Sequence, residues 1–212
     1  MAGNVLTVAQ QKGGSGKTTL AIHLAVQFAA MGRSVALLDT DPQGSLGRWF
    51  MARRERLGDE VGMEFGTASA WGVSYECEKL SRDHDLVIID TPPKIDADLR
   101  PALRVADLVL IPVATSQMDL WATESVQELA QREGRSSLVV LNRVPPRARI
   151  TGEITEQIDA AGIERAQSML GNRVAYAEAL GHGGAAGEKG RMSPAAQEIL
   201  ALATEVAAHL DG

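Results

Sequence analysis

The chain of 212 residues is 45% hydrophobic and 23% charged, the balance of a globular protein with enough apolar material for a core. It has no run of about 18 apolar residues, and no basic segment leading into an apolar one at its start. We therefore expect no membrane span, no signal peptide and a cytoplasmic location. A net charge of −6 argues against a general polyanion binder, and the single cysteine, Cys77, excludes an internal disulfide.

Charge is unevenly distributed along the chain. Five arginines and one acidic residue lie between Gln131 and Arg149, and four more arginines lie between Arg48 and Arg56. No lysine or arginine follows Arg191. A local nucleic-acid-binding patch is therefore compatible with the acidic total.

Short apolar runs rich in valine, leucine and isoleucine alternate with longer helical patterns. The runs are apolar on both faces, which is typical of strands buried in a parallel sheet. They cover Val5–Ala9, Ser34–Asp39, Asp85–Asp90, Asp107–Pro112 and Ser137–Asn142. Helical spacing, with Gly32 ending the first helix and Ser193 capping the last, predicts helices over Lys17–Met31, Ser116–Arg132, Thr151–Ala161 and Pro194–Leu210.

This alternation predicts one α/β domain over residues 1–212, with a mostly parallel twisted sheet and helices on both faces. The glycine-rich run 181–187 is the best candidate for a mobile loop. Five further residues, His23, Cys77, Trp49, Trp71 and Trp121, are predicted to pack in the core or at its edge.

The first strand leads into the segment Gln10–Thr19, which reads QQKGGSGKTT and is followed at once by a helix. Glycines at such a junction let backbone N–H groups converge on phosphate oxygens at the positive end of the helix. Lys17 would then reach the β- and γ-phosphates of ATP, and the Thr18 hydroxyl would bind Mg²⁺. The alternative is a plain glycine turn. The expected ATP-binding residues are Lys12, Gly13, Gly14, Ser15, Gly16, Lys17, Thr18 and Thr19.

The loop departs from the standard phosphate-loop pattern at two positions. Gln11 stands where glycine is usual, and Lys12 adds a second cation at the entrance of the loop. In this the sequence resembles the ParA/MinD family of P-loop ATPases, which carry a deviant Walker A motif with two lysines. The resemblance implies that Lys12 crosses a dimer interface to the partner's nucleotide, and that Lys12 and Lys17 are both catalytic.

Two carboxylates follow predicted strands and fit the same family. Asp41, in the segment Leu37–Gly44, resembles the family aspartate beside the attacking water and Mg²⁺, and is the third expected catalytic residue. The alternative is a turn aspartate before Pro42. Asp90, in Leu86–Pro93, looks like the end of a Walker B strand and would support Mg²⁺ through water. Thr18, Asp41 and Asp90 are thus the expected metal-site residues.

Two weaker matches lie in the second half of the chain. Asn142, at the end of the last predicted strand, resembles the family's adenine-reading asparagine, whose amide pairs with the base edge. The alternative is a strand-terminal asparagine that caps a turn. The segment Gly171–Ala179 resembles the family's Pro-Arg segment, with Asn172 in place of proline.

The sequence narrows the choice of branch within the family. One cysteine excludes relatives that need paired cysteines, and the length leaves no room for a glutaminase domain. MinD-type proteins end in a basic membrane-binding helix, whereas the tail from Ser193 to Gly212 has no lysine or arginine. We expect its Ile199, Ala203, Val206 and Leu210 to pack on the core. What remains is the small ParA type.

By resemblance, such a protein uses ATP and Mg²⁺ to form a homodimer that binds non-specific DNA and is nucleoid-associated. It positions or segregates a cargo, and a centromere-binding or cargo-adaptor protein stimulates its slow hydrolysis; no membrane is expected. Phosphate contacts would supply affinity without sequence readout. The DNA-binding candidates, each of which is alternatively a solvated surface residue, are Arg143, Arg147, Arg149, Arg173, Lys189 and Arg191.

Two other functions stay open at this stage. In the first, the same loop donates phosphate to a small molecule, as in relatives that resemble dethiobiotin synthetase. In the second, the protein is a MinD-like regulator at a membrane. The acidic tail disfavours the second function, and no dedicated substrate pocket can be named for the first.

Overall fold

A computed structural model describes residues 2–93, 99–188, 190 and 192–212 of the chain. Its sheet has six strands, all parallel, in the order β3-β2-β4-β1-β5-β6. The predicted α/β class is confirmed. The strands are β1 (Asn4–Val8), β2 (Val35–Asp39), β3 (Glu64–Thr67), β4 (Leu86–Asp90), β5 (Leu108–Ala114) and β6 (Ser136–Asn142).

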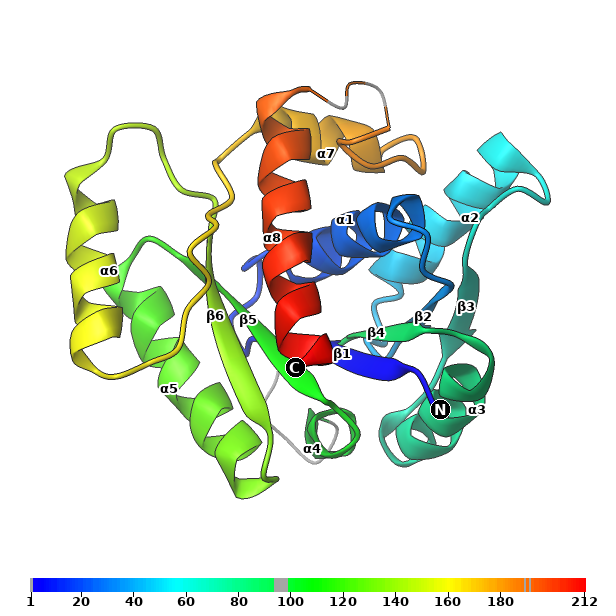
Figure 1. Cartoon of the computed structure of the whole chain (residues 1–212), viewed down its shortest axis with the longest axis horizontal. Coiled ribbons are helices and arrows are strands. Elements are labelled where there is room, and N and C mark those ends of the chain that lie inside the picture. Colours follow the sequence, from blue (N-terminus) through cyan, green and yellow to red (C-terminus); the bar gives the residue numbers. More distant parts are fainter. Residues whose placement is uncertain (1, 94–98, 189, 191) are drawn as a thin grey trace.

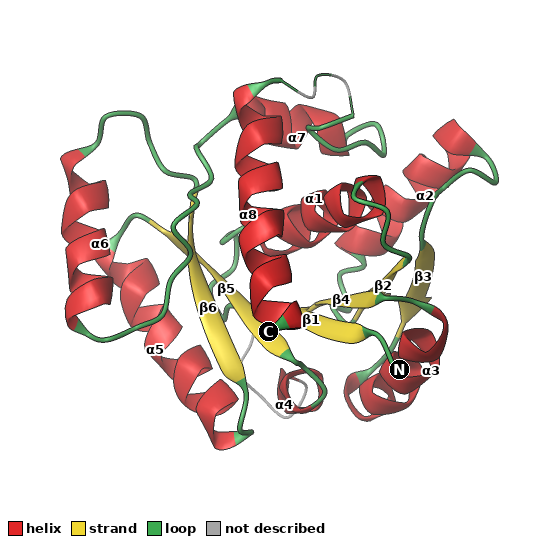
Figure 2. Ribbon diagram, in the orientation of Figure 1, coloured by secondary structure: helices red, strands yellow, loops and turns green. Residues whose placement is uncertain are grey.

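Helices cover both faces of the sheet (Figures 1 and 2). On one face lie α1 (Lys17–Ala30), α2 (Ser45–Leu57), α7 (Val174–Leu180) and α8 (Pro194–Asp211). On the other face lie α3 (Val73–Asp83), α4 (Leu99–Arg104), α5 (Gln117–Arg132) and α6 (Arg149–Ala160), and the short 3₁₀ turn η1 (Ala70–Gly72) leads into α3.

Alternating side chains of the central strands pack into separate hydrophobic cores on the two faces of the sheet. In β1, Leu6 and Val8 pack with α1 and α8, whereas Val5 packs with α3. Because both faces are covered, the central strands carry apolar residues at nearly every position, as a parallel sheet requires. This explains why five of the strands were recognisable as apolar runs.

The C-terminal helix α8 begins as the sequence predicts. The Ser193 side chain accepts a hydrogen bond from the Ala196 N–H, and Pro194 occupies the first turn. Three of the predicted contact residues, Ile199, Ala203 and Val206, are buried, and Leu210 is partly buried against the same core. No helix within the described residues is both long and apolar enough to span a membrane.

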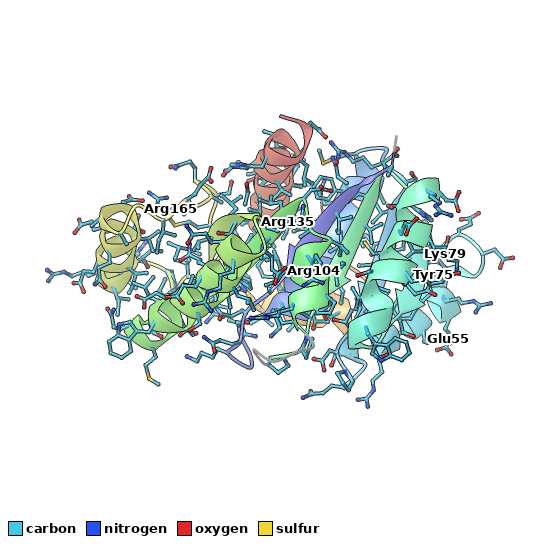
Figure 3. All side chains as sticks on the ribbon, turned by 90° about the horizontal axis from the view of Figure 1, so that it is seen from below. Glu55, Tyr75, Lys79, Arg104, Arg135 and Arg165 are labelled. Carbon is cyan, nitrogen blue, oxygen red and sulfur yellow. The ribbon has the colours of Figure 1, made fainter. Side chains whose placement is uncertain are left out.

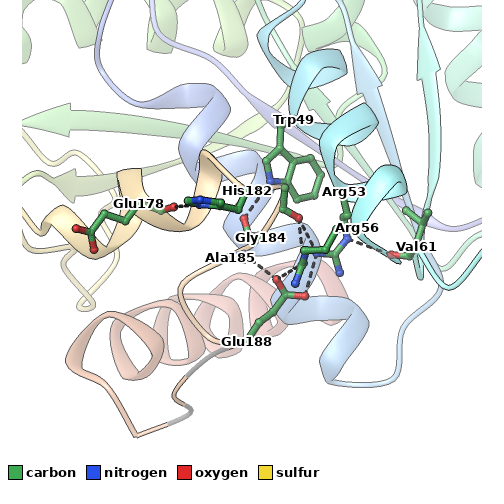
Figure 4. A network of polar contacts seen from close by, with 10 residues as sticks. Trp49, Arg53, Arg56, Val61, Glu178, His182, Gly184, Ala185 and Glu188 are labelled. Atoms are coloured by element: carbon green, nitrogen blue, oxygen red, sulfur yellow. Dashed lines mark hydrogen bonds and ion pairs between the residues drawn. The ribbon is translucent and has the colours of Figure 1, made fainter. Parts of the chain in front are cut away.

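The glycine-rich run 181–187, the predicted candidate for a mobile loop, is hydrogen-bonded to α2 through Gly183 and Gly184 (Figure 4). The Trp49 indole N–H donates to the Gly184 carbonyl at 3.0 Å, and Arg53 donates to the Gly183 carbonyl at 3.2 Å. Gly183 has φ +64°, and a Cβ there would lie 2.2 Å from the Arg53 backbone nitrogen. Glycine is therefore required where this loop meets the helix.

The prediction for the aromatic and thiol side chains was right for some residues and wrong for others. His23, Trp49 and Cys77 are buried. Trp71 and Trp121 are 88% and 60% exposed, because each lies on the outer side of a helical turn at the carboxyl edge of the sheet.

Candidate nucleotide-binding site

The glycine loop lies between β1 and α1, at the carboxyl edge of the sheet. Gly14 and Gly16 have φ of +77° and +92°, and Gly16 is the N-cap of α1. Their left-handed backbone leaves the first turn of the helix open to an anion. A cavity of about 610 Å³ adjoins this turn, and its lining includes Gly13, Lys17, Thr18 and Asp41.

Lys17 and Thr18 line the cavity, and the buried Asp90 is hydrogen-bonded to Thr18. Burial lowers the pKa of Lys17, while the nearby carboxylates of Asp90 and Asp41 oppose that shift. The Thr18 hydroxyl donates to Asp90 Oδ2 at 2.6 Å. Burial raises the pKa of Asp90 to about 7, so this carboxyl group is held in a poorly solvated position.

The donor set fits a magnesium ion held with a nucleotide. Asp90 Oδ1 is buried and has no hydrogen-bond partner among the described residues, so one carboxylate oxygen remains available. Mg²⁺ in phosphate-loop sites takes a Thr hydroxyl, phosphate oxygens and waters, and a nearby carboxylate holds such a water. Thr18 and Asp90 supply these groups.

Asp41 lines the cavity just beyond β2, and a second aspartate, Asp39, holds its loop in place. Asp39 Oδ1 accepts from the Asp41 N–H at 3.0 Å, and Asp39 Oδ2 accepts from the Gly47 N–H at 3.1 Å. Burial raises the pKa of Asp39. Asp39 is not among the site residues expected from the sequence, but its position as the last residue of a buried strand is a signal in the sequence.

Lys12 is not among the residues that line the cavity beside Lys17. Its Nζ lies 2.8 Å from Asp119 Oδ2, in the first turn of α5. The unusual Gln11 is explained by the same helix, because its side chain donates to the Ala122 carbonyl at 2.9 Å. Asp119 was not singled out from the sequence.

Asn142 connects β6 to the glycine loop. Its Nδ2 donates to the Ser15 carbonyl at 2.8 Å, and its Oδ1 accepts from the Arg143 N–H at 2.9 Å. A Cβ at Gly16 would lie 2.5 Å from this Nδ2. The amide therefore supports the loop in this structure, and an adenine contact would need it to exchange partners.

The candidate DNA-binding arginines fall into two environments. Arg143, Arg147 and Arg149 are exposed in and after the β6–α6 connection, and Arg143 also lines the nucleotide cavity. Arg173 lies on the segment beside this connection, because the Val144 N–H donates to the Leu170 carbonyl and the Asn172 N–H donates to the Val144 carbonyl. Lys189 and Arg191 lie outside the described residues.

Arg173 is paired with an acidic residue of the same chain. Its guanidinium contacts the carboxylate of Glu198 on α8, with Nε–Oε1 at 2.9 Å. The hydrogen bond with Glu198 raises the pKa of Arg173. The same Glu198 side chain also accepts a hydrogen bond from the Tyr176 hydroxyl. A structural role therefore competes with DNA contact at this position.

The long basic stretch of the sequence is divided by β6. Arg132 and Arg135 precede the strand, and Arg143, Arg147 and Arg149 follow it, so the two groups are about 20 Å apart at 3.3 Å per residue. Arg135 donates to the Arg104 carbonyl, and the two residues lie near the middle of the view from below (Figure 3). In the group after the strand, Arg143 lines the nucleotide cavity.

The fold and the glycine loop define a P-loop nucleotide-binding protein. The family model of the CobQ/CobB/MinD/ParA nucleotide-binding domain (CbiA) matches residues 6–186, and the chain belongs to this family. It is a ParA/MinD-like ATPase.

Named relatives extend over nearly the whole chain. The chain is 30% identical over 209 residues to the maintenance of carboxysome distribution protein A of Halothiobacillus neapolitanus, covering 95% of each protein. It is 28% identical to the chromosome-partitioning ATPase Soj of Thermus thermophilus, covering 97% of this chain and 96% of Soj.

Solved structures share the fold at lower identity. An ATP complex of Cyanothece McdA superimposes with a TM-score of 0.82 at 18% identity, over 98% of this chain and 97% of that one. The cell division ATPase MinD of Pyrococcus furiosus gives a TM-score of 0.80 at 21% identity, over 97% and 99% of the two chains.

Proposed function

We propose that this protein is an ATP-driven positioning ATPase that dimerises on binding ATP, holds non-specific DNA and moves or segregates a cargo. The observation that carries the proposal is the second cation of the loop. The Lys12 side chain is 41% exposed, and its ammonium group contacts Asp119 on α5. Lys12 does not line the cavity that Lys17 lines. A lysine in this position is available to the nucleotide of a second copy.

In this proposal, each chain holds its own ATP and Mg²⁺ through the glycine loop. The backbone of residues 13–19 and the Lys17 ammonium bind phosphates, and Thr18 and Asp90 hold the ion directly and through water. The ion supplies positive charge at the phosphates. Asp41, which lines the same cavity, would orient the attacking water.

Charge explains why dimerisation would depend on ATP. Two chains of net charge −6 repel, and bound phosphates add to that repulsion. Each Lys12 would neutralise the partner's phosphates only while those phosphates are present. Hydrolysis, expected to be slow without a stimulating partner, would remove this attraction and return the chains to monomers.

The DNA-binding face would be built around the β6–α6 connection. Arg147 and Arg149 are exposed, and Arg143 of the same connection lines the nucleotide cavity, so closing a dimer there would bring two copies of this basic loop together. Contacts to phosphates alone suit a protein that moves over the nucleoid. We place the working site of the protein in the cytoplasm on that basis.

The cargo class is suggested by the relatives. One is named for carboxysome distribution and another for chromosome partitioning, so the cargo proposed here is a plasmid, a chromosome region or a cytoplasmic assembly. A centromere-binding or cargo-adaptor protein would be the partner that stimulates hydrolysis.

The decisive experiment is retention on non-specific duplex DNA at low salt, with ATP·Mg²⁺ and then with ADP. Retention with ATP alone, lost as salt rises, is the expected result. Light scattering should show an ATP-dependent dimer for the native chain and none for Lys12→Ala. No retention in either nucleotide state would overturn the proposal and favour phosphate transfer to a small molecule.

A further inference from the structure

The contact between Lys12 and Asp119 joins an exposed cation to a buried anion. Asp119 is only 4% exposed, whereas the Lys12 side chain is 41% exposed. Asp119 Oδ2 accepts from Lys12 Nζ at 2.8 Å and from the Ser116 hydroxyl, and the Ser116 Oγ accepts in turn from the Asp119 N–H. The carboxylate is therefore fixed by the N-terminal cap of α5, and the lysine comes to it.

The residues before Lys12 are bound to the same helix. The Gln10 side chain donates to Thr123 Oγ1 at 3.3 Å, and the Gln11 side chain donates to the Ala122 carbonyl at 2.9 Å. Three consecutive side chains of the loop entrance thus contact the first two turns of α5. This alignment directs Lys12 to Asp119 and away from the chain's own glycine loop.

We propose that Asp119 is a positioning residue that holds Lys12 while the protein is monomeric and competes for it with the phosphates of a second copy. This inference rests on the proposed function. Dimerisation would then require an exchange in which the Lys12 ammonium leaves the Asp119 carboxylate for a partner's nucleotide. Asp119 would set the protein concentration at which ATP produces dimers.

The surroundings of Asp119 make this exchange feasible. A buried carboxylate that loses its cation is normally destabilised. Here the Ser116 hydroxyl and the N-terminus of α5 remain to stabilise the negative charge. On the same turns, Met118 and Trp121 are 68% and 60% exposed, so a second copy seated over Lys12 would also cover apolar surface.

The test compares Asp119→Asn with Glu124→Gln, which removes one negative charge from an exposed position on the same helix. With ATP·Mg²⁺, Asp119→Asn should dimerise at an about five- to tenfold lower protein concentration, the size expected for losing one partly exposed charged pair. Glu124→Gln should match the native chain. Lys12→Ala/Asp119→Asn should gain nothing over Lys12→Ala, because the effect acts through Lys12.

A second readout follows Lys12 itself in the nucleotide-free protein. Reductive methylation measured by mass spectrometry should be slower at Lys12 than at the more exposed Lys79, and should rise several-fold in Asp119→Asn. If that variant does not fold, Asp119→Ser, whose hydroxyl can still accept a hydrogen bond from the capping residue Ser116, replaces it. Thermal unfolding identifies the folded variants.

The outcomes separate this inference from the proposed function. Equal methylation of Lys12 in the native chain and Asp119→Asn, or weaker dimerisation of the variant, would overturn the role of Asp119. A native chain that never dimerises with ATP would overturn the proposed function and the competition together. Methylation would in that case still report whether Asp119 holds Lys12.

Discussion

The Thr18 hydroxyl donates a 2.6 Å hydrogen bond to Asp90 Oδ2, which ties the first turn of α1 to the end of β4. The other carboxylate oxygen, Oδ1, is buried without a hydrogen-bond partner in the described part of the chain. The same aspartate is therefore half engaged by the protein and half available to an ion.

Nucleotide binding should depend on pH through Asp90. Burial raises its pKa to about 7, so the nucleotide-free protein holds a proton there at lower pH. Binding of Mg²⁺ favours the ionised form, and the affinity for ATP·Mg²⁺ should fall by up to about tenfold per pH unit below 7. Calorimetric titration between pH 6 and pH 8 measures this. Asp90→Asn should bind more weakly and lose the dependence; a native affinity that is flat over this range would contradict the prediction.

Asp90 should also make the stability of the nucleotide-free chain depend on pH. Stability is favoured by the protonated form of this group, whereas Mg²⁺ binding is favoured by the ionised form. The folded chain holds this proton more tightly than the unfolded chain, whose aspartates titrate near pH 4. The contribution of Asp90 to the free energy of unfolding should therefore decrease as pH rises from about 4 to about 7. Urea unfolding of the nucleotide-free chain, compared with Asp90→Asn, isolates this term.

Asn142→Ala should loosen the glycine loop from β6. The change removes the hydrogen bonds to the Ser15 carbonyl and the Arg143 N–H, so the free energy of unfolding should fall by about 1–2 kcal/mol. ATP affinity should fall roughly tenfold, because the loop is less well ordered before binding. Asn172→Ala, at an exposed position, is the control and should leave both quantities nearly unchanged.

Asp41→Ala should separate binding from hydrolysis. Asp41 lines the cavity, and its Oδ1 accepts a local hydrogen bond from the Gln43 N–H, two residues along the chain, so its loss should leave the loop intact. Hydrolysis should fall by about 100-fold or more, while ATP affinity changes by only a few-fold. Asp59→Ala, in an exposed position after α2, provides the comparison. Undiminished turnover would remove Asp41 from the mechanism.

Replacing both Arg147 and Arg149 by Ala should weaken DNA retention in a salt-dependent way. If both contact phosphates, the slope of log affinity against log salt should decrease in magnitude by about 2. Arg132→Ala is the matched control, because Arg132 lies before β6 and pairs with Glu128. An unchanged slope in the double variant would place the DNA elsewhere.

Gly183→Ala should be severely destabilising for a glycine in a surface loop. Its φ of +64° and the 2.2 Å approach of a Cβ to the Arg53 nitrogen force the loop away from α2. A loss of about 3 kcal/mol in the free energy of unfolding is expected. Gly187→Ala should cost less than about 0.5 kcal/mol, because a Cβ there would lie 3.7 Å from the nearest atom, Gln27 Oε1.

The central strands and the long helices were predictable because they are buried in a regular way. The five apolar runs fall within two residues of the observed strands, and Ser116 and Ser193 cap α5 and α8. The edge strand β3 was missed, since Glu64 and Thr67 are exposed and interrupt any apolar pattern. Helix α3 was also not predicted, and the short helices α4 and α7 were missed because about two turns carry too little periodicity.

The clustering of the candidate site residues was predictable where it depends on a local motif. Residues of the loop between Gly13 and Thr19 line one cavity together with Asp41, and Asp90 is hydrogen-bonded to Thr18 of that loop. The partners that hold these groups were not predictable. Asp119 lies 107 positions from Lys12, and Asn142 lies 127 positions from Ser15, so only the fold brings each pair together.

The strand order has a mechanical consequence. β1 lies between β4 and β5 and so joins the strands β3, β2 and β4 on one side of the sheet to β5 and β6 on the other. The glycine loop after β1 is hydrogen-bonded to both sides, through Asp90 of β4 and through Asn142 of β6. A nucleotide bound in this loop therefore stabilises the contacts of the loop with both halves of the sheet. Its binding energy should accordingly protect the backbone amides of both halves from hydrogen exchange to the same degree, including those of β6 far from the phosphates.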